Sequence, residues 1–133
     1  MTLLEAAVVI FCRHRDPACV ATVTRHVPMI AALADSYGVP PMLAVAVCAQ
    51  ESQLLTVRAR SLCGTAAGDP ETSATIATDA LAGWRHRCRA WDGALRVYRY
   101  GGRCTGPDPE GYVPQVRAIE RRVRCAMRTG RRC

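Results

Sequence analysis

The stretch Pro40–Gln53, PPMLAVAVCAQESQ, decides how the rest of the chain is organised. Its two prolines suit the first turn of a helix, where a missing N–H breaks no hydrogen bond. The eight residues from Met42 to Ala49 then carry no polar side chain other than the Cys48 thiol. We therefore expect a helix over about 40–54 that is buried on every side.

The same stretch ends in Glu51, and the periodicity does not change before it. A carboxylic acid on the last turn of a buried helix is expensive to ionise, so it can hold a proton near neutral pH. A general acid needs this property. The alternative is that the helix end is solvated and Glu51 points into water.

The composition predicts one helical domain. A chain of 133 residues is long enough for one domain with a core, 1–133, and too short for two. Half of the residues are hydrophobic and few are aromatic, which favours close packing of helices. No run alternates with period two for long enough to predict a strand, so the expected class is all-α. The predicted helices lie at about 3–13, 17–25, 28–37, 40–54, 72–89, 92–99 and 110–128.

Helix boundaries follow from individual residues. Pro28 predicts a break near His26, which makes His26 a boundary or surface residue. Gly38 is expected to end the preceding helix, and Asp92 to cap the short helix after Trp91.

The charge is strongly basic and includes no lysine: all 18 basic residues are arginine, against 11 acids, for a net charge of +7. Such a balance attracts any polyanion, whether nucleic acid, an anionic membrane or a cell-wall polymer. Four arginines share one face of the last helix, which is either a solvated face or a polyanion surface: Arg117, Arg121, Arg124 and Arg128. No helix-turn-helix or aromatic stacking platform accompanies them, so nucleic acid is not the expected partner.

Eight cysteines without a Cys-x-x-Cys pair predict disulfides and an oxidising destination. They are Cys12, Cys19, Cys48, Cys63, Cys88, Cys104, Cys125 and Cys133. The sequence leaves their pairing open, and Cys48 can also be read as a free buried thiol. The pair His86 and Cys88 has no matching second half, so no metal site is expected.

The N-terminal segment does not read as an export signal. Residues 1–12 are apolar but carry Glu5, have no basic region and are too short to span a bilayer. Thr2 and Glu5 form a capping-box pattern instead. We therefore expect no transmembrane segment. A phage protein that is built in the cytoplasm and oxidised after release would reconcile these features, which predicts a virion, extracellular or periplasmic location.

Residues 64–68 have the glycine spacing of a phosphate loop, but no Gly-Lys-Ser/Thr follows and no strand precedes. We expect no nucleotide and no other cofactor.

Four pieces in order resemble the soluble-type (SLT) lytic transglycosylase domain, which has a goose-type lysozyme-like fold. They are AQES (49–52), SLCGTA (61–66), ALRVYRYG (94–101) and YVPQV (112–116). The resemblance covers about 26–125 and leaves 1–25 as an N-terminal helical extension. It implies bacterial peptidoglycan as the substrate and Glu51 as the sole acid and base. The matched motifs also imply substrate contacts from Ser52, Ser61, Gly64, Tyr98, Tyr100 and Tyr112.

Two substrate-holding features of that family are missing here. The family's Gly-Leu-Met-Gln after the serine loop is replaced by residues 66–71, AAGDPE, and the asparagine of its Tyr-Asn-x-Gly is Arg99. An alternative reading is therefore an inactive lysozyme-like component of a phage tail or baseplate, in contact with other virion proteins. A hydrolytic variant would instead need a second carboxylate near Glu51. The acids considered for that role are Asp69, Glu71, Asp79 and Asp92.

Overall fold

The computed structural model describes residues 1–133 and is all-helical, with six α-helices and no strand. The helices are α1 (Leu3–Phe11), α2 (Pro17–Tyr37), α3 (Pro41–Ser52), α4 (Pro70–Cys88), α5 (Trp91–Tyr100) and α6 (Tyr112–Thr129). Two short 3-10 turns, η1 (Arg13–Arg15) and η2 (Gln53–Leu55), follow α1 and α3.

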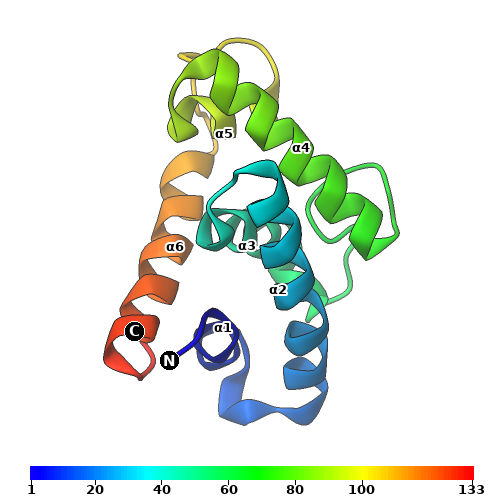
Figure 1. Ribbon diagram of the computed structural model, residues 1–133, viewed down its shortest axis with the longest axis vertical. Coiled ribbons are helices and arrows are strands. Elements are labelled where there is room, and N and C mark those ends of the chain that lie inside the picture. The colour runs from blue at the N-terminus through cyan, green and yellow to red at the C-terminus, as the bar shows by residue number, and fades with distance from the viewer.

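Helix α3 is the centre of the molecule, and the other helices surround it (Figure 1). All seven residues from Leu43 to Ala49 are buried, as the uniformly apolar stretch predicts. α2 packs on one side of α3 and α6 on another. Glu51 therefore emerges from the core at a fixed place, because its helix is held on several sides.

Helix α1 fills the space between α2 and α6 (Figure 1). Ala6, Ala7 and Ile10 are at most 3% exposed and join the hydrophobic core. The capping box between Thr2 and Glu5 is present, as predicted. Because α1 contributes core residues, the segment 1–25 is packed into the same body as the rest of the chain.

The predicted break at Pro28 is wrong: α2 runs without interruption from Pro17 to Tyr37 and ends at the left-handed Gly38. Pro28 and Thr24, whose carbonyl loses its helical partner, both lie on the exposed face, where water can take the place of that hydrogen bond. The core residues Val23 and Ile30 hold the helix on either side of the proline.

His26 is a core residue, and the prediction of a boundary or surface position is wrong. It is 3% exposed, and its Nδ1 lies 3.0 Å from the carbonyl oxygen of Leu54 in η2. Because a carbonyl only accepts, Nδ1 carries the proton and donates it. Burial lowers the pKa of His26, so the neutral ring is favoured.

Helix α2 alone has the length and apolarity to cross a membrane. Length and apolarity alone are weak evidence for a membrane span, because the core helix of a globular domain can have both. Its residues Val23, Val27 and Ile30 are buried within the protein.

The eight cysteines form four disulfides, each between consecutive cysteines, and none is free. The pairs are Cys12–Cys19, Cys48–Cys63, Cys88–Cys104 and Cys125–Cys133. The reading of Cys48 as a free thiol is thus wrong. Four bridges are consistent with an oxidising, extracellular environment.

The junction of α5 and α6 is closed by an ion-pair cluster. Arg117 donates from Nε to Asp92 at 2.9 Å and from Nη1 to Glu120 at 2.9 Å. Asp92 lies in the first turn of α5 but does not cap it, since the N-cap is Ala90. The predicted cap is therefore wrong, and the carboxylate serves Arg117 instead.

Candidate functional site

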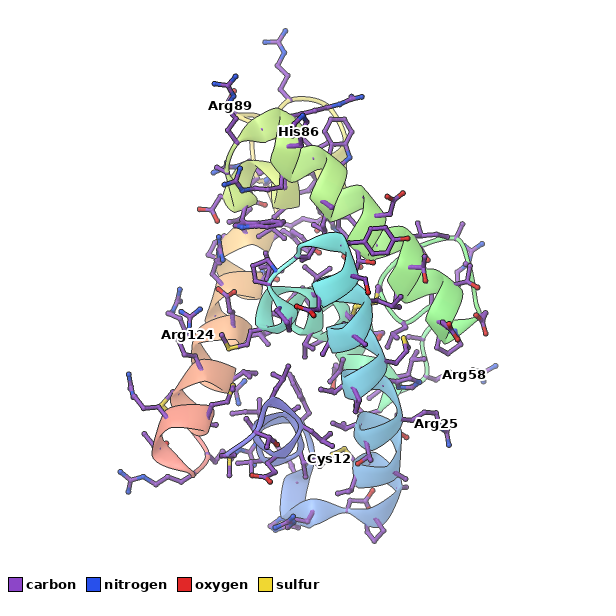
Figure 2. The ribbon with its side chains drawn as sticks, in the orientation of Figure 1. Cys12, Arg25, Arg58, His86, Arg89 and Arg124 are labelled. Atoms are coloured by element: carbon purple, nitrogen blue, oxygen red, sulfur yellow. A yellow bond between two sulfur atoms is a disulfide. The ribbon has the colours of Figure 1, made fainter.

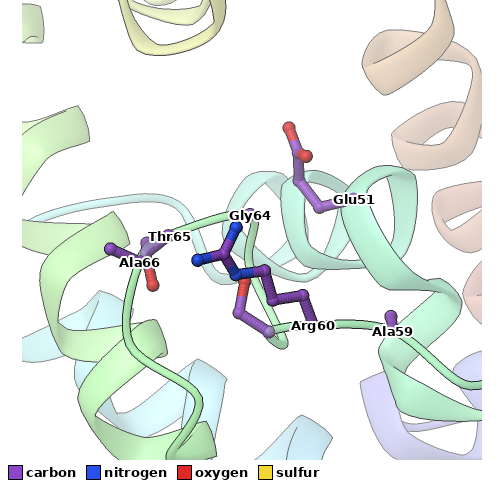
Figure 3. A pocket seen from close by; sticks show the side chains of 7 residues that line it. Glu51, Ala59, Arg60, Gly64, Thr65 and Ala66 are labelled. Atoms are coloured by element: carbon purple, nitrogen blue, oxygen red, sulfur yellow. The ribbon is translucent and has the colours of Figure 1, made fainter.

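Glu51 lies in the last turn of α3 with a side chain that is only 11% exposed. Its carboxylate rises from the helix end above the loop formed by residues 59–66 (Figure 3). The alternative that Glu51 lies at a solvated helix end and points into water is therefore wrong. The acid is enclosed but still reachable from the surface.

The loop comes so close to Glu51 that only glycine fits at position 64. A Cβ on Gly64 would lie 2.8 Å from Cγ of Glu51 and closer still to its carboxyl group. Gly64 also has φ +76°, a left-handed conformation that favours glycine. Backbone and carboxylate are therefore in direct contact here.

Three bonds hold this loop to α3 and α5. The Cys48–Cys63 disulfide joins α3 to the residue before Gly64. Ser52 Oγ donates to the Leu62 carbonyl at 2.6 Å, and the Tyr98 hydroxyl donates to the Cys63 carbonyl. Bonds to α3 and to α5 thus fix the position of the loop relative to Glu51.

Two surface hollows share Glu51. One, of about 340 Å³, is lined by the loop residues Ala59, Arg60, Ser61, Gly64, Thr65 and Ala66 (Figure 3). The other, of about 180 Å³, is lined by Gln50, Arg99, Glu110 and Tyr112. A bound chain that passes through both hollows would have Glu51 at its middle.

Arg99 is the charged partner of Glu51. Its Nη1 lies 3.4 Å from Glu51 Oε2, while Nε and Nη2 both donate to Glu110 Oε2, at 2.9 and 2.8 Å. Its guanidinium also lies over the ring of Tyr112, 5.6 Å from the centroid. The hydrogen bonds to Glu110 come first among the causes that raise the pKa of Arg99, so this cation persists at any working pH.

Two tyrosines enclose the carboxylate. Burial, followed by the negative charge of Glu51, raises the pKa of both Tyr98 and Tyr112. The Tyr112 hydroxyl is buried without a well-formed hydrogen bond, and Glu51 is the side chain with which it interacts. A buried donor without a partner, beside an acid, is a group that a ligand oxygen can satisfy.

Only some of the residues expected to contact substrate lie at the hollows around Glu51. Ser61, Gly64 and Tyr112 line the hollows at Glu51. Ser52 is 3% exposed, with its hydroxyl bonded within the protein, which gives it a supporting place under the loop. Tyr100 donates to Asp108 and lines a different hollow with residues 101–109.

Sequence reasoning missed Arg60, Arg99, Glu110 and Gln50 as residues of this region. Arg99 replaces the asparagine of the family motif, and that motif does not predict its contact with Glu51. Gln50 is oriented by Gln115, to whose Oε1 it donates at 2.6 Å, and Gln115 donates in turn to the Glu110 carbonyl. No periodicity in the sequence signals the contacts of Gln50 with Gln115 and of Arg99 with Glu51, because their partners are 65 and 48 residues apart in the chain.

None of the four acids considered as a second carboxylate lines the hollows at Glu51. Asp69 caps α4 and Glu71 follows in its first turn, Asp79 is exposed on the same helix, and Asp92 pairs with Arg117. Glu110 is the carboxylate that the structure brings near Glu51 instead, through Arg99. No group of three or more His, Cys, Asp or Glu side chains is placed to hold a metal ion.

The arginines are spread over the molecule. Arg89 and Arg124 project on one side of the body, and Arg25 and Arg58 project on the other (Figure 2). Only Arg99 and Arg117 form ion pairs. The positive charge is therefore general over the surface and is not confined to the predicted face of α6.

Comparison of the chain with protein-family models, with curated proteins and with solved structures finds no match in any of the three.

Proposed function

We propose that the protein cleaves the glycan strands of peptidoglycan as a lytic transglycosylase, with Glu51 as the only acid and base. The observation that carries the proposal is the placement of Glu51: a carboxylate that is 11% exposed, at the end of a buried helix, with a hollow on either side. The resemblance of residues 26–125 to that family, which rests on motifs in the right order, points the same way.

In this reaction, Glu51 protonates the glycosidic oxygen between N-acetylmuramic acid and N-acetylglucosamine, and the bond breaks. The resulting carboxylate then takes the proton of the muramic C6 hydroxyl as that oxygen closes a 1,6-anhydro ring. One group acts first as acid and then as base, so no second carboxylate is required.

The surroundings of Glu51 support both steps. The buried Tyr112 hydroxyl is available to hydrogen-bond a sugar oxygen, and Gly64 keeps the loop backbone close to the carboxylate. Arg99 stabilises the negative charge that remains on Glu51 after the first step.

The test is a digest of purified peptidoglycan by the wild-type protein and by Glu51→Gln, with mass spectrometry of the released fragments. Anhydro-muramic ends from the wild type alone are expected. Reducing ends would indicate a hydrolase and direct attention to Glu110. No release from either protein would contradict an enzymatic role.

A second function, that of a structural or wall-binding component of a phage virion, is favoured by one observation. Arg99 is bonded to both Glu51 and Glu110, which fits a carboxylate used for stability. Under this function Glu51→Gln leaves wall binding unchanged and cleavage is absent in both proteins.

A further inference from the structure

A third hollow, of about 510 Å³, lies beside the two that share Glu51. It is formed where α1, the ends of α3 and η1, and α6 meet, and Gln50 lines both this hollow and the one that contains Arg99. The third hollow therefore adjoins the one that contains Arg99, with Gln50 at their border, and that hollow in turn shares Glu51 with the first. We call this third hollow the arginine hollow.

Three guanidinium groups line the arginine hollow: those of Arg13, Arg122 and Arg132. None of them is ion-paired, and no acidic side chain lines the hollow. Guanidinium groups bind carboxylates and phosphates by paired hydrogen bonds. The charge of the hollow therefore favours an anionic ligand.

The remaining lining is apolar or amide. Ile10, Phe11 and Ile119 provide an apolar wall, and Gln50 and Gln53 provide amide groups. A bare phosphate needs no apolar wall. A short peptide that bears carboxylates, methyl groups and peptide bonds matches all three kinds of surface.

A disulfide and a hydrogen bond position the C-terminal tail beside the arginine hollow. The Cys125–Cys133 disulfide folds the C-terminal tail back onto α6, and Arg122 Nε donates to the Cys133 carbonyl at 3.4 Å. This keeps Arg132 over the hollow.

Gln53, which lines the hollow, begins a run of three non-glycine residues with positive φ, from +51° to +61°, and Arg13 directly precedes two more. Left-handed residues of this kind are strained and gather at functional sites.

We propose that the arginine hollow binds the carboxylate-bearing peptide stem of peptidoglycan while the attached glycan lies in the hollows around Glu51. This inference rests on the proposed function, because the stem is joined to the muramic sugar that the reaction would hold next to Glu51. Gln50, at the border of the two regions, lies where sugar and peptide meet.

The test uses the Glu51→Gln protein, which leaves the ligand intact, and measures binding by calorimetry. The probes are glycan strands with their peptide stems, the same strands after amidase has removed the stems, the free tetrapeptide stem and a DNA oligonucleotide. Arg13→Gln/Arg132→Gln is added to remove two guanidiniums that make no hydrogen bond in the structure. Arg121→Gln/Arg124→Gln, on the exposed part of α6, is the control with the same change of charge.

We expect Arg13→Gln/Arg132→Gln to weaken binding of stem-bearing strands and of the free stem by at least about tenfold, since bonds to charged groups are the stronger ones. The control pair is expected to change binding by less than about twofold, because it removes the same charge outside the arginine hollow. Strands without stems should not distinguish the two pairs.

Equal effects of the two pairs would overturn the inference, and so would an equal loss on strands with and without stems. DNA binding that depends on Arg13 and Arg132, with no binding of the stem, would overturn it in favour of a phosphate site. Cleavage by the wild type with no effect of these arginines would overturn the inference and leave the proposed function. Arginine-dependent binding of the free stem without any cleavage would overturn the proposed function and leave the inference that the hollow binds the stem.

Discussion

Glu51 and Glu120 are two nearly buried carboxylates, each facing an arginine, in different parts of the molecule. Glu120 is 8% exposed, and Arg117 holds it at 2.9 Å. Glu51 is 11% exposed, and Arg99 lies at 3.4 Å. Glu120 lines no hollow, whereas Glu51 lines two. Both carboxylates are nearly buried and face an arginine, but only Glu51 is accessible from a surface hollow.

The comparison teaches that a buried acid by itself indicates nothing about catalysis. Arg117 divides its guanidinium between Glu120 and Asp92 and so ties α5 to α6. Arg99 divides its guanidinium between Glu51 and Glu110, and there the space around the pair is open to a ligand. The first cluster joins two helices, and the second lies beside a hollow that a ligand can enter.

The largest effect is expected from the disulfide beside Glu51. Cys48→Ala/Cys63→Ala and Cys88→Ala/Cys104→Ala open loops of 15 and 16 residues. Each should lower the free energy of unfolding by about 3 kcal/mol, measured by denaturant titration. Only the first should also abolish glycan cleavage, because Cys63 holds Gly64 against Glu51. Equal activity of the two variants would show that the loop needs no such support.

The next effect concerns Gly64, for which Gly38 is a matched control. Both have positive φ, +76° and +72°, but only at Gly64 does a Cβ meet a neighbour, the Glu51 side chain. Alanine at either position should lower the free energy of unfolding by about 1–2 kcal/mol through backbone strain.

Gly64→Ala should in addition reduce cleavage about 100-fold, since displacement of a reacting group by about 1 Å has that effect. Gly38→Ala should leave cleavage unchanged in the same assay. If Gly64→Ala kept full activity, the contact between Gly64 and Glu51 would have no functional role.

The third effect sharpens the contrast in stability. Glu120→Gln should lower the free energy of unfolding by about 1–3 kcal/mol, because Arg117 loses a charged partner in a nearly buried place. Glu51→Gln should leave stability unchanged or raise it, as is common for residues kept for activity. Thermal and urea unfolding of the two variants check this. A larger loss for Glu51→Gln would assign Glu51 to structure.

The smallest effect is a pH dependence from His26. Burial lowers its pKa below the ordinary value of 6.5, so the unfolded chain binds a proton at higher pH than the folded one. Stability should therefore be constant above pH 6.5 and fall as the pH drops from there toward the lowered pKa. Urea midpoints at pH 7.5, 6.5 and 5.5 measure the slope. His26→Asn should remove it, and a slope of equal size in that variant would exclude His26 as its source.

Much of the fold could be predicted because its signals are local. The apolar run before Glu51, the cap at Thr2 and the glycine at the end of α2 act within a few residues, and all lie at the predicted positions. Pro28 misled because its effect depends on which face of the helix is exposed, which is a tertiary property.

Of the candidate site, Glu51, Ser61, Gly64, Tyr98 and Tyr112 could be predicted, because they belong to contiguous motifs. Arg99 faces Glu51 from α5, and Glu110 and Gln115 approach from the start of α6. Such contacts arise when helices pack, and the sequence contains no spacing that encodes them. The disulfide pairing was open for the same reason.

The central claim is that Glu51, and not merely any buried acid, performs the cleavage. Its most direct measurement is the rate of release of peptidoglycan fragments by wild type, Glu51→Gln and Glu120→Gln, with equal amounts of folded protein. Loss of a general acid should reduce the rate for Glu51→Gln by about 10²–10⁴-fold, while Glu120→Gln keeps the wild-type rate. Equal rates for the two variants, or no release by the wild type, would contradict the account.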